Sequence, residues 1–126
     1  MQTGHTKRRR YARLKVDQPV FIEVLQENGT SNGGANGFSR TKSLGEGGCS
    51  FRSPEDIGYL SLMKVAISLG SHVVVADGRA VYQLAQRDGG YEIGVEFLRV
   101  SSDDRLHIRQ MVASSANGVT RKATPR

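Results

Sequence analysis

Apolar and polar residues alternate along several stretches of the chain, which is the pattern of β-strands that bury one face. The alternating or continuous apolar runs lie at residues 16–25, 49–52, 61–69, 73–75, 81–84 and 91–97. Asp77 and Gly78 separate two of these runs and predict either a hairpin or a bulged strand. About six strands joined by short turns therefore predict a mainly all-β fold, in which a six-stranded antiparallel sheet closes into a barrel and leaves no long edge open.

One helix is predicted after the last strand. Residues 101–104, Ser-Ser-Asp-Asp, supply a capping hydroxyl and place acids in the first helical turn, where negative charge is favourable. An apolar stripe follows at Ile108, Met111 and Val112. We expect this stripe to lie across the barrel, with Arg105 and Arg109 on the other side of the helix.

Charge is distributed unevenly along the 126 residues. The chain holds 18 Lys and Arg residues against 12 Asp and Glu residues, a net charge of +6. Residues 1–16 and 114–126 contain no acid, so the basic groups gather at the two ends and the body is slightly acidic. We therefore divide the chain into a flexible basic arm at 1–13, a barrel with its helix at 14–113, and a disordered basic tail at 114–126. Residues 27–39, rich in Gly, Asn and Ser, predict a flexible loop.

The composition argues against several classes of protein. No apolar run approaches the roughly 20 residues of a membrane-spanning helix, and no secretory signal is expected. The lone cysteine, Cys49, excludes an internal disulfide and is expected to be a small buried residue. His5, His72 and His107 lack metal-ligand spacing, and no nucleophile has a base near it in the sequence. We expect a small soluble cytoplasmic protein that is not an enzyme and has no metal site.

Two segments carry candidate binding residues. The first is the basic arm, which contains Arg8, Arg9, Arg10 and Arg13. Guanidinium groups bind phosphates and the O6/N7 edge of guanine through paired hydrogen bonds, and they stack on flat rings. The second is the glycine-rich segment 43–51, whose glycines leave backbone amides open to a ligand. Taken alone, this second segment fits a tight, bulged hairpin turn better than it fits a ligand site.

Together these features resemble the PilZ domain family. In that family an Arg-x-x-x-Arg pair precedes the first strand and is followed by a turn of pattern Asp/Asn-x-Ser-x-x-Gly, a Gly-Val-x-Phe strand and a capped helix. The counterparts here are Arg9 and Arg13, residues 43–48, residues 94–97, and the helix from about Ser102. The resemblance runs from about residue 7 to residue 112, with all four elements in order.

The resemblance implies a PilZ-type barrel that binds the bacterial second messenger cyclic di-GMP. The implied site residues are Arg8, Arg9, Arg10, Arg13, Ser43, Gly45 and Gly48. Arg9 and Arg13 would contact guanine edges and phosphates, with Arg8 or Arg10 helping by stacking or charge. The turn would hold the other side of a guanine. The resemblance also implies a small adaptor that changes conformation on binding and signals to an unidentified protein partner. No cofactor other than this ligand is expected, and nucleic acid is not the expected partner because stacking aromatics are scarce.

Two positions depart from the family pattern. Ser43 stands where the family has Asp or Asn, and Gly45 stands where it has Ser. Losing one charge-assisted and one neutral hydrogen bond costs about 2–4.5 kcal/mol, or roughly thirty- to a thousand-fold in affinity if nothing compensates. A gapped match would instead put Thr41 and Ser43 on the two polar positions. The alternative function is therefore a PilZ-like protein-interaction module with weak or no nucleotide binding.

Overall fold

Antiparallel strands form most of the described part of the chain, which is residues 13–25 and 37–123 of this computed structural model, with side chains described as far as residue 114. The strands are β1 (Arg13–Lys15), β2 (Pro19–Val24), β3 (Gly37–Gly45), β4 (Gly48–Ser53), β5 (Leu62–Ser68), β6 (Val73–Ala85) and β7 (Tyr91–Val100). A helix, α2 (Ser102–Ala123), follows the last strand.

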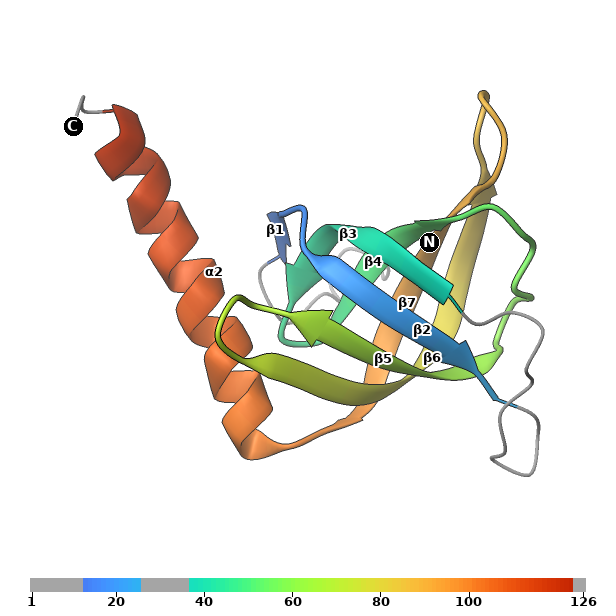
Figure 1. Cartoon of the computed structure of the whole chain (residues 1–126), viewed down its shortest axis with the longest axis horizontal. Helices are drawn as coiled ribbons and strands as arrows, with labels where there is room; N and C mark the ends of the chain where they lie inside the picture. The colour runs from blue at the N-terminus through green and yellow to red at the C-terminus, as the bar shows by residue number, and fades with distance from the viewer. Residues whose placement is uncertain (1–12, 26–36, 124–126) are drawn as a thin grey trace, which may run out of the picture.

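Six of these strands close into an antiparallel barrel, which confirms the predicted fold class. Neighbouring strands follow the order β3-β2-β5-β6-β7-β4, and the pairing of β4 with β3 completes the ring. Strand β1 is an addition to the prediction, because this short strand pairs with β3 outside the ring. Figure 1 shows the closed barrel and the long helix that leaves it at one end.

The interior of the barrel is filled mostly by apolar residues of the predicted runs, together with Leu44 of β3, Ala76 and Ala80 of β6, and Ile108 of α2. The buried apolar side chains are Val20, Ile22, Val24, Leu44, Cys49, Phe51, Met63, Val65, Ile67, Val74, Ala76, Ala80, Ile93, Val95, Phe97 and Ile108. Because successive side chains of a strand point to opposite faces, the residues between them face outward and are available for a site. Cys49 is fully buried, as predicted.

Strand β6 is one bulged strand, which is the second of the two predicted alternatives, with register shifts at Asp77/Gly78 and at Ala80/Tyr82. Two strand starts differ from the sequence prediction. The strand predicted from residue 16 starts at Pro19, because residues 16–18 connect β1 to β2. Strand β3 begins at Gly37, inside the predicted loop. Sequence alternation did not reveal this strand, because a register shift between Thr41 and Ser43 breaks the period-2 pattern that marks a strand.

The helix begins as predicted and ends later. The Ser101 hydroxyl oxygen accepts a hydrogen bond from the Asp104 amide at 3.0 Å, which is an N-cap. Ile108 is fully buried in the barrel core, with Met111 and Val112 packed against it. Helical backbone continues to Ala123, where the sequence predicted a disordered tail from 114. A single Gly at 118 weakens a helix without ending it, and the first proline after the start of the helix is residue 125.

Most of the predicted basic arm lies outside the described residues. Arg13, its last residue, is the first residue of β1 and is therefore part of the sheet. Among the described residues, no helix is both long and apolar enough to cross a membrane.

Candidate ligand-binding site

A row of paired residues crosses the outer face of the barrel from β1 to β6. In order across the strands, its members are Lys15, Ser43, Ser50, Gly94 and Tyr82, which we call the outer row. A second row on the same face, two residues along β1, contains Arg13, Gly45, Gly48 and Glu96. The register therefore brings together four of the residues predicted from the sequence, although they come from three different strands.

Gly48 lies where two chain segments come too close for a side chain. A Cβ atom at this position would be 2.0 Å from the backbone oxygen of Val95 and 3.3 Å from Nη2 of Arg13. Real Cβ atoms do not approach a backbone oxygen this closely, so only glycine fits here. The guanidinium of Arg13 is thereby placed directly over the glycine of the β3–β4 turn.

The serine that replaces the family Asp or Asn has a close polar neighbour. The hydroxyls of Ser43 and Ser50 are hydrogen-bonded at 2.8 Å, with Ser50 almost fully buried. Thr41 serves the fold instead: its buried hydroxyl donates to the Val16 carbonyl at 2.6 Å and accepts from the Gln18 amide at 3.0 Å. Ser43, and not Thr41, is therefore the hydroxyl of this strand that lies in the outer row.

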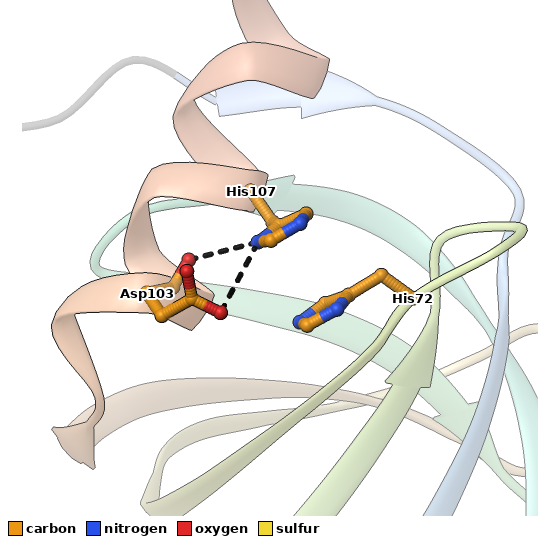
Figure 2. Close-up of side chains that lie close together, drawn as sticks. All are labelled: His72, Asp103 and His107. Atoms are coloured by element: carbon orange, nitrogen blue, oxygen red, sulfur yellow. Dashed lines mark hydrogen bonds and ion pairs between the residues drawn. The ribbon is translucent and has the colours of Figure 1, made fainter.

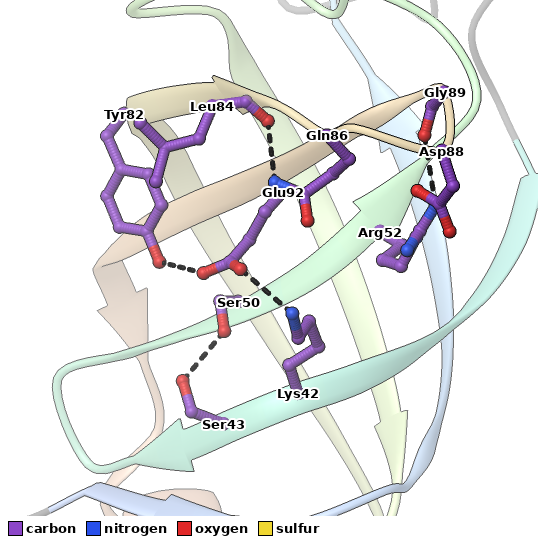
Figure 3. Close-up of polar contacts among 10 residues, drawn as sticks. All are labelled: Lys42, Ser43, Ser50, Arg52, Tyr82, Leu84, Gln86, Asp88, Gly89 and Glu92. Carbon is purple, nitrogen blue, oxygen red and sulfur yellow. Dashed lines mark hydrogen bonds and ion pairs between the residues drawn. The ribbon is translucent and has the colours of Figure 1, made fainter.

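Tyr82 brings an aromatic ring to the end of the outer row. A Cβ on Gly94 would lie 1.9 Å from Cε2 of Tyr82, so the missing side chain of Gly94 makes room for the ring against β7. The Tyr82 hydroxyl donates to Glu92 Oε2 at 2.8 Å, and Lys42 Nζ donates to Glu92 Oε1 at 3.0 Å. Figure 3 shows this chain of contacts beside the Ser43–Ser50 pair.

The electrostatics of this cluster follow from burial and neighbouring charge. Burial raises the pKa of Tyr82, and its hydrogen bond to the Glu92 carboxylate raises it further, while Ser50 and the positive charge of Arg13 act in the opposite direction. Burial alone would raise the pKa of Glu92, but the contacts with Tyr82 and Lys42 lower it overall. Burial raises the pKa of the Cys49 thiol to about 12, so this cysteine is unreactive at neutral pH.

An open basic groove of about 710 Å³ lies beside the outer row. The residues lining it are Lys15, Val16, Asp17, Ser39, Arg40, Thr41, Lys42 and Arg52. Four of these side chains are cationic and one is anionic, so the groove favours negatively charged ligands. Arg40 forms an ion pair with Asp17, and Arg52 donates to Asp88 Oδ1 at 3.1 Å, both at exposed positions where such pairs are weak.

The β3–β4 turn is held by the helix. Arg109 donates two hydrogen bonds of 3.1 Å to the Glu46 carboxylate, and Arg105 donates one of 3.1 Å to the Glu46 backbone oxygen. The expectation that both arginines lie away from the barrel is therefore wrong. The apolar stripe lies on the helix face that meets the core, and these two long side chains reach past it to the rim of the barrel.

The structure brings four of the predicted site residues together and does not describe the other three. Arg13, Ser43, Gly45 and Gly48 lie on one outward face. Arg8, Arg9 and Arg10 lie outside the described residues, and their role stays a prediction.

Sequence analysis missed several residues of the polar cluster. These are Lys42, Ser50, Tyr82 and Glu92. The outward parity of Ser50 and Glu92 was visible in the sequence, but only the strand register shows that the four residues meet.

Comparison with known proteins identifies the family. The chain matches the PilZ domain model over residues 7–114 and belongs to the PilZ domain family. In a comparison with curated proteins, none is significantly similar in sequence.

Solved structures share the fold at low sequence identity. The inhibitor of motility MotI/DgrA of Bacillus subtilis is 13% identical with a TM-score of 0.68, covering 94% of this chain and 53% of that one. YcgR of Escherichia coli, in complex with c-di-GMP, is 19% identical with a TM-score of 0.69, covering 92% and 49%. The K. pneumonia MrkH–c-di-GMP complex is 18% identical with a TM-score of 0.70, covering 90% and 55%. The chain thus spans about half the length of each of these proteins.

The Tyr82–Glu92 pair gives a testable pH dependence. Replacing Glu92→Gln removes the negative charge that favours the protonated phenol, so the pKa of Tyr82 is expected to fall toward its ordinary value near 10. Ultraviolet absorbance titration measures this pKa, with Tyr82→Phe assigning the signal among the four tyrosines. Glu96→Gln, an exposed change on the same strand, is the control. An unchanged Tyr82 pKa in Glu92→Gln would contradict the assigned contact.

Proposed function

We propose that this protein is a receptor for cyclic di-GMP and that the ligand binds on the outer face of the barrel at β1, β3 and β4. The observation that carries the proposal is the position of the Arg13 guanidinium over Gly48, next to Ser43 and the basic groove. Membership of the PilZ family and the c-di-GMP complexes of the related YcgR and MrkH structures support it.

Each part of the ligand has a matching group on this face. Arg13 presents a planar fork to a phosphate or to the O6/N7 edge of guanine, and Arg9 would supply the second fork from the arm. Arg8 and Arg10 would add positive charge or stack on a base. Lys15 and the other cations of the groove would receive the remaining negative charge. The half-buried ring of Tyr82 offers a surface on which a base can stack.

The cations beside the turn can compensate for the two departures from the family pattern, at Ser43 and Gly45. Gly45 gives no side chain, and the Ser43 hydroxyl shares its hydrogen-bonding capacity with Ser50. Charge-assisted contacts from the groove can offset the lost hydrogen bonds, because each contributes about 1.5–3 kcal/mol. We therefore propose that this protein binds its ligand chiefly through arginine and lysine side chains and less through the turn.

The contact between the turn and the helix supplies a route for signalling. Glu46 lies in the β3–β4 turn between Gly45 and Gly48, and it holds Arg105 and Arg109 of α2. A ligand that prefers one arrangement of the turn would shift the population of helix positions by that difference in affinity. We propose that the protein acts as an adaptor in this way, with a protein partner that recognises the changed surface.

The other parts of the proposal follow from the binding role. We propose that the protein works in the cytoplasm, where the second messenger is found, and that it is not an enzyme. Binding needs no cofactor besides the ligand itself.

Arg13→Ala tests the central contact. Loss of one charge-assisted contact of about 1.5–3 kcal/mol is expected to weaken cyclic di-GMP binding by about 10- to 150-fold. Isothermal titration calorimetry on the full chain measures the affinity, and thermal denaturation checks that the barrel remains folded. Arg99→Ala is the charge-matched control, because Arg99 is 85% exposed and outside the groove. Equal affinity of wild type and Arg13→Ala would overturn the assigned site.

The alternative function, an interaction module without useful nucleotide affinity, is favoured by Ser43 and Gly45. It predicts no saturable binding of cyclic di-GMP by the wild-type chain. Restoring the family pattern with Ser43→Asp and Gly45→Ser is expected to strengthen binding by roughly thirty- to a thousand-fold if the ungapped match is right. Calorimetry with the double variant measures this gain, and GTP serves as the selectivity control. Unchanged or weaker affinity would show that the turn is used differently.

The signalling route has its own test in Glu46→Gln. In the wild-type chain, cyclic di-GMP is expected to change the hydrogen exchange of amides in α2, because the turn and the helix are linked through Glu46. In Glu46→Gln this ligand-dependent change is expected to fall by about half or more, since the charged pair with Arg109 is lost. Glu55→Gln, an exposed change away from the turn, is the control. The same exchange difference in both variants would contradict the route.

A further inference from the structure

Two histidines and an aspartate meet where the β5–β6 turn touches the start of α2. His72 follows a tight turn that is closed by a hydrogen bond of 2.8 Å from the Leu69 amide to the His72 carbonyl. Asp103 and His107 are four residues apart on the helix and therefore lie on the same side of it. The proposed binding site for cyclic di-GMP does not include these residues.

The two imidazole rings lie face to face. Their centroids are 3.6 Å apart and their planes differ by 3°. Figure 2 shows the rings one above the other, with the Asp103 carboxylate beside their edges. One nitrogen of each ring and one Asp103 oxygen all lie within 4.8 Å of one another.

These separations, up to 4.8 Å, are wider than those of a bound metal site, so the side chains must move closer to hold an ion. With metal–ligand bonds of about 2.0–2.1 Å, the donor atoms of a tetrahedral site are roughly 3.4 Å apart. Each ring must turn about its Cβ–Cγ bond to bind, because parallel rings do not aim their lone pairs at a common point. The Asp103 side chain is 72% exposed, so it has the freedom to move inward.

Neighbouring groups orient the two rings. His72 Nε2 lies 2.7 Å from Asp104 Oδ1, and the other oxygen of Asp104 accepts the Val75 amide at 3.1 Å. His107 Nδ1 lies 2.9 Å from the Asp103 backbone oxygen. A ligating histidine usually hydrogen-bonds through its other ring nitrogen to a carboxylate or a carbonyl, which raises its basicity.

We propose that His72, Asp103 and His107 bind one divalent transition-metal ion of the zinc class, with water completing the coordination. Two imidazoles and one carboxylate suit Zn²⁺ and its neighbours in the first transition row, whereas Mg²⁺ and Ca²⁺ prefer sets of oxygen ligands. The side chains of His72 and His107 are 29% and 35% exposed, so an ion can reach the site from solvent. The bound ion would link the β5–β6 turn to the first two turns of α2.

Calorimetric titration of the full chain with Zn²⁺ tests the proposal. We expect one ion per chain, and an affinity lowered by about tenfold or more in each of His72→Gln, Asp103→Asn and His107→Gln. His5→Gln is the matched control, because His5 is the only other histidine of the chain. The affinity of this variant for Zn²⁺ is expected to equal that of wild type. Zn²⁺ is also expected to raise the melting temperature, since a ligand of the folded state stabilises it.

A second measurement guards against variants that fail to fold. Co²⁺ bound by the wild-type chain is expected to broaden the imidazole NMR signals of His72 and His107 and to leave the signals of His5 sharp. Circular dichroism verifies the fold of each variant, and Asp103→Asn changes only an exposed side chain. Wild-type protein that binds no Zn²⁺, or binding that is lost only in His5→Gln, would overturn the proposal.

Discussion

The pairing of β4 with both β3 and β7 is the interaction on which the rest of the structure depends. It closes the barrel, and it requires β4 to pass so near Val95 that Gly48 tolerates no side chain. Because Gly48 has no side chain, the guanidinium of Arg13 can lie close above it. Closure of the fold and formation of the candidate site therefore have one physical cause, which is the register of three neighbouring strands.

Charge then distinguishes the two ends of the site. On one side the open groove gathers Lys15, Arg40, Lys42 and Arg52, which favours an anionic ligand. On the other side the turn carries Glu46, whose carboxylate is held by Arg109 of the helix. Because Arg109 holds the Glu46 carboxylate, this pair joins the β3–β4 turn to α2, and it is the link that the proposed signalling route uses.

How much the sequence predicts depends on the distance over which each feature is determined. Alternation along single strands predicted the barrel, and Ser101 predicted the start of the helix, because both are local patterns. The family pattern marked Arg13, Ser43, Gly45 and Gly48, which the strand register brings together; their role in binding stays a prediction. The contacts of Tyr82 with Glu92, and of Glu46 with Arg109, were not predictable, since they depend on strand register and on the side of the helix that meets the barrel.

The most direct test of the account is to map cyclic di-GMP onto the barrel by NMR. In a titration of the isotope-labelled chain, the account predicts the largest amide shifts at Arg13, Ser43, Gly45 and Gly48, with smaller shifts at the start of α2. Shifts confined to other faces of the barrel, or no shifts at saturating ligand, would contradict the claim that the Arg13–Gly48 face is the binding site.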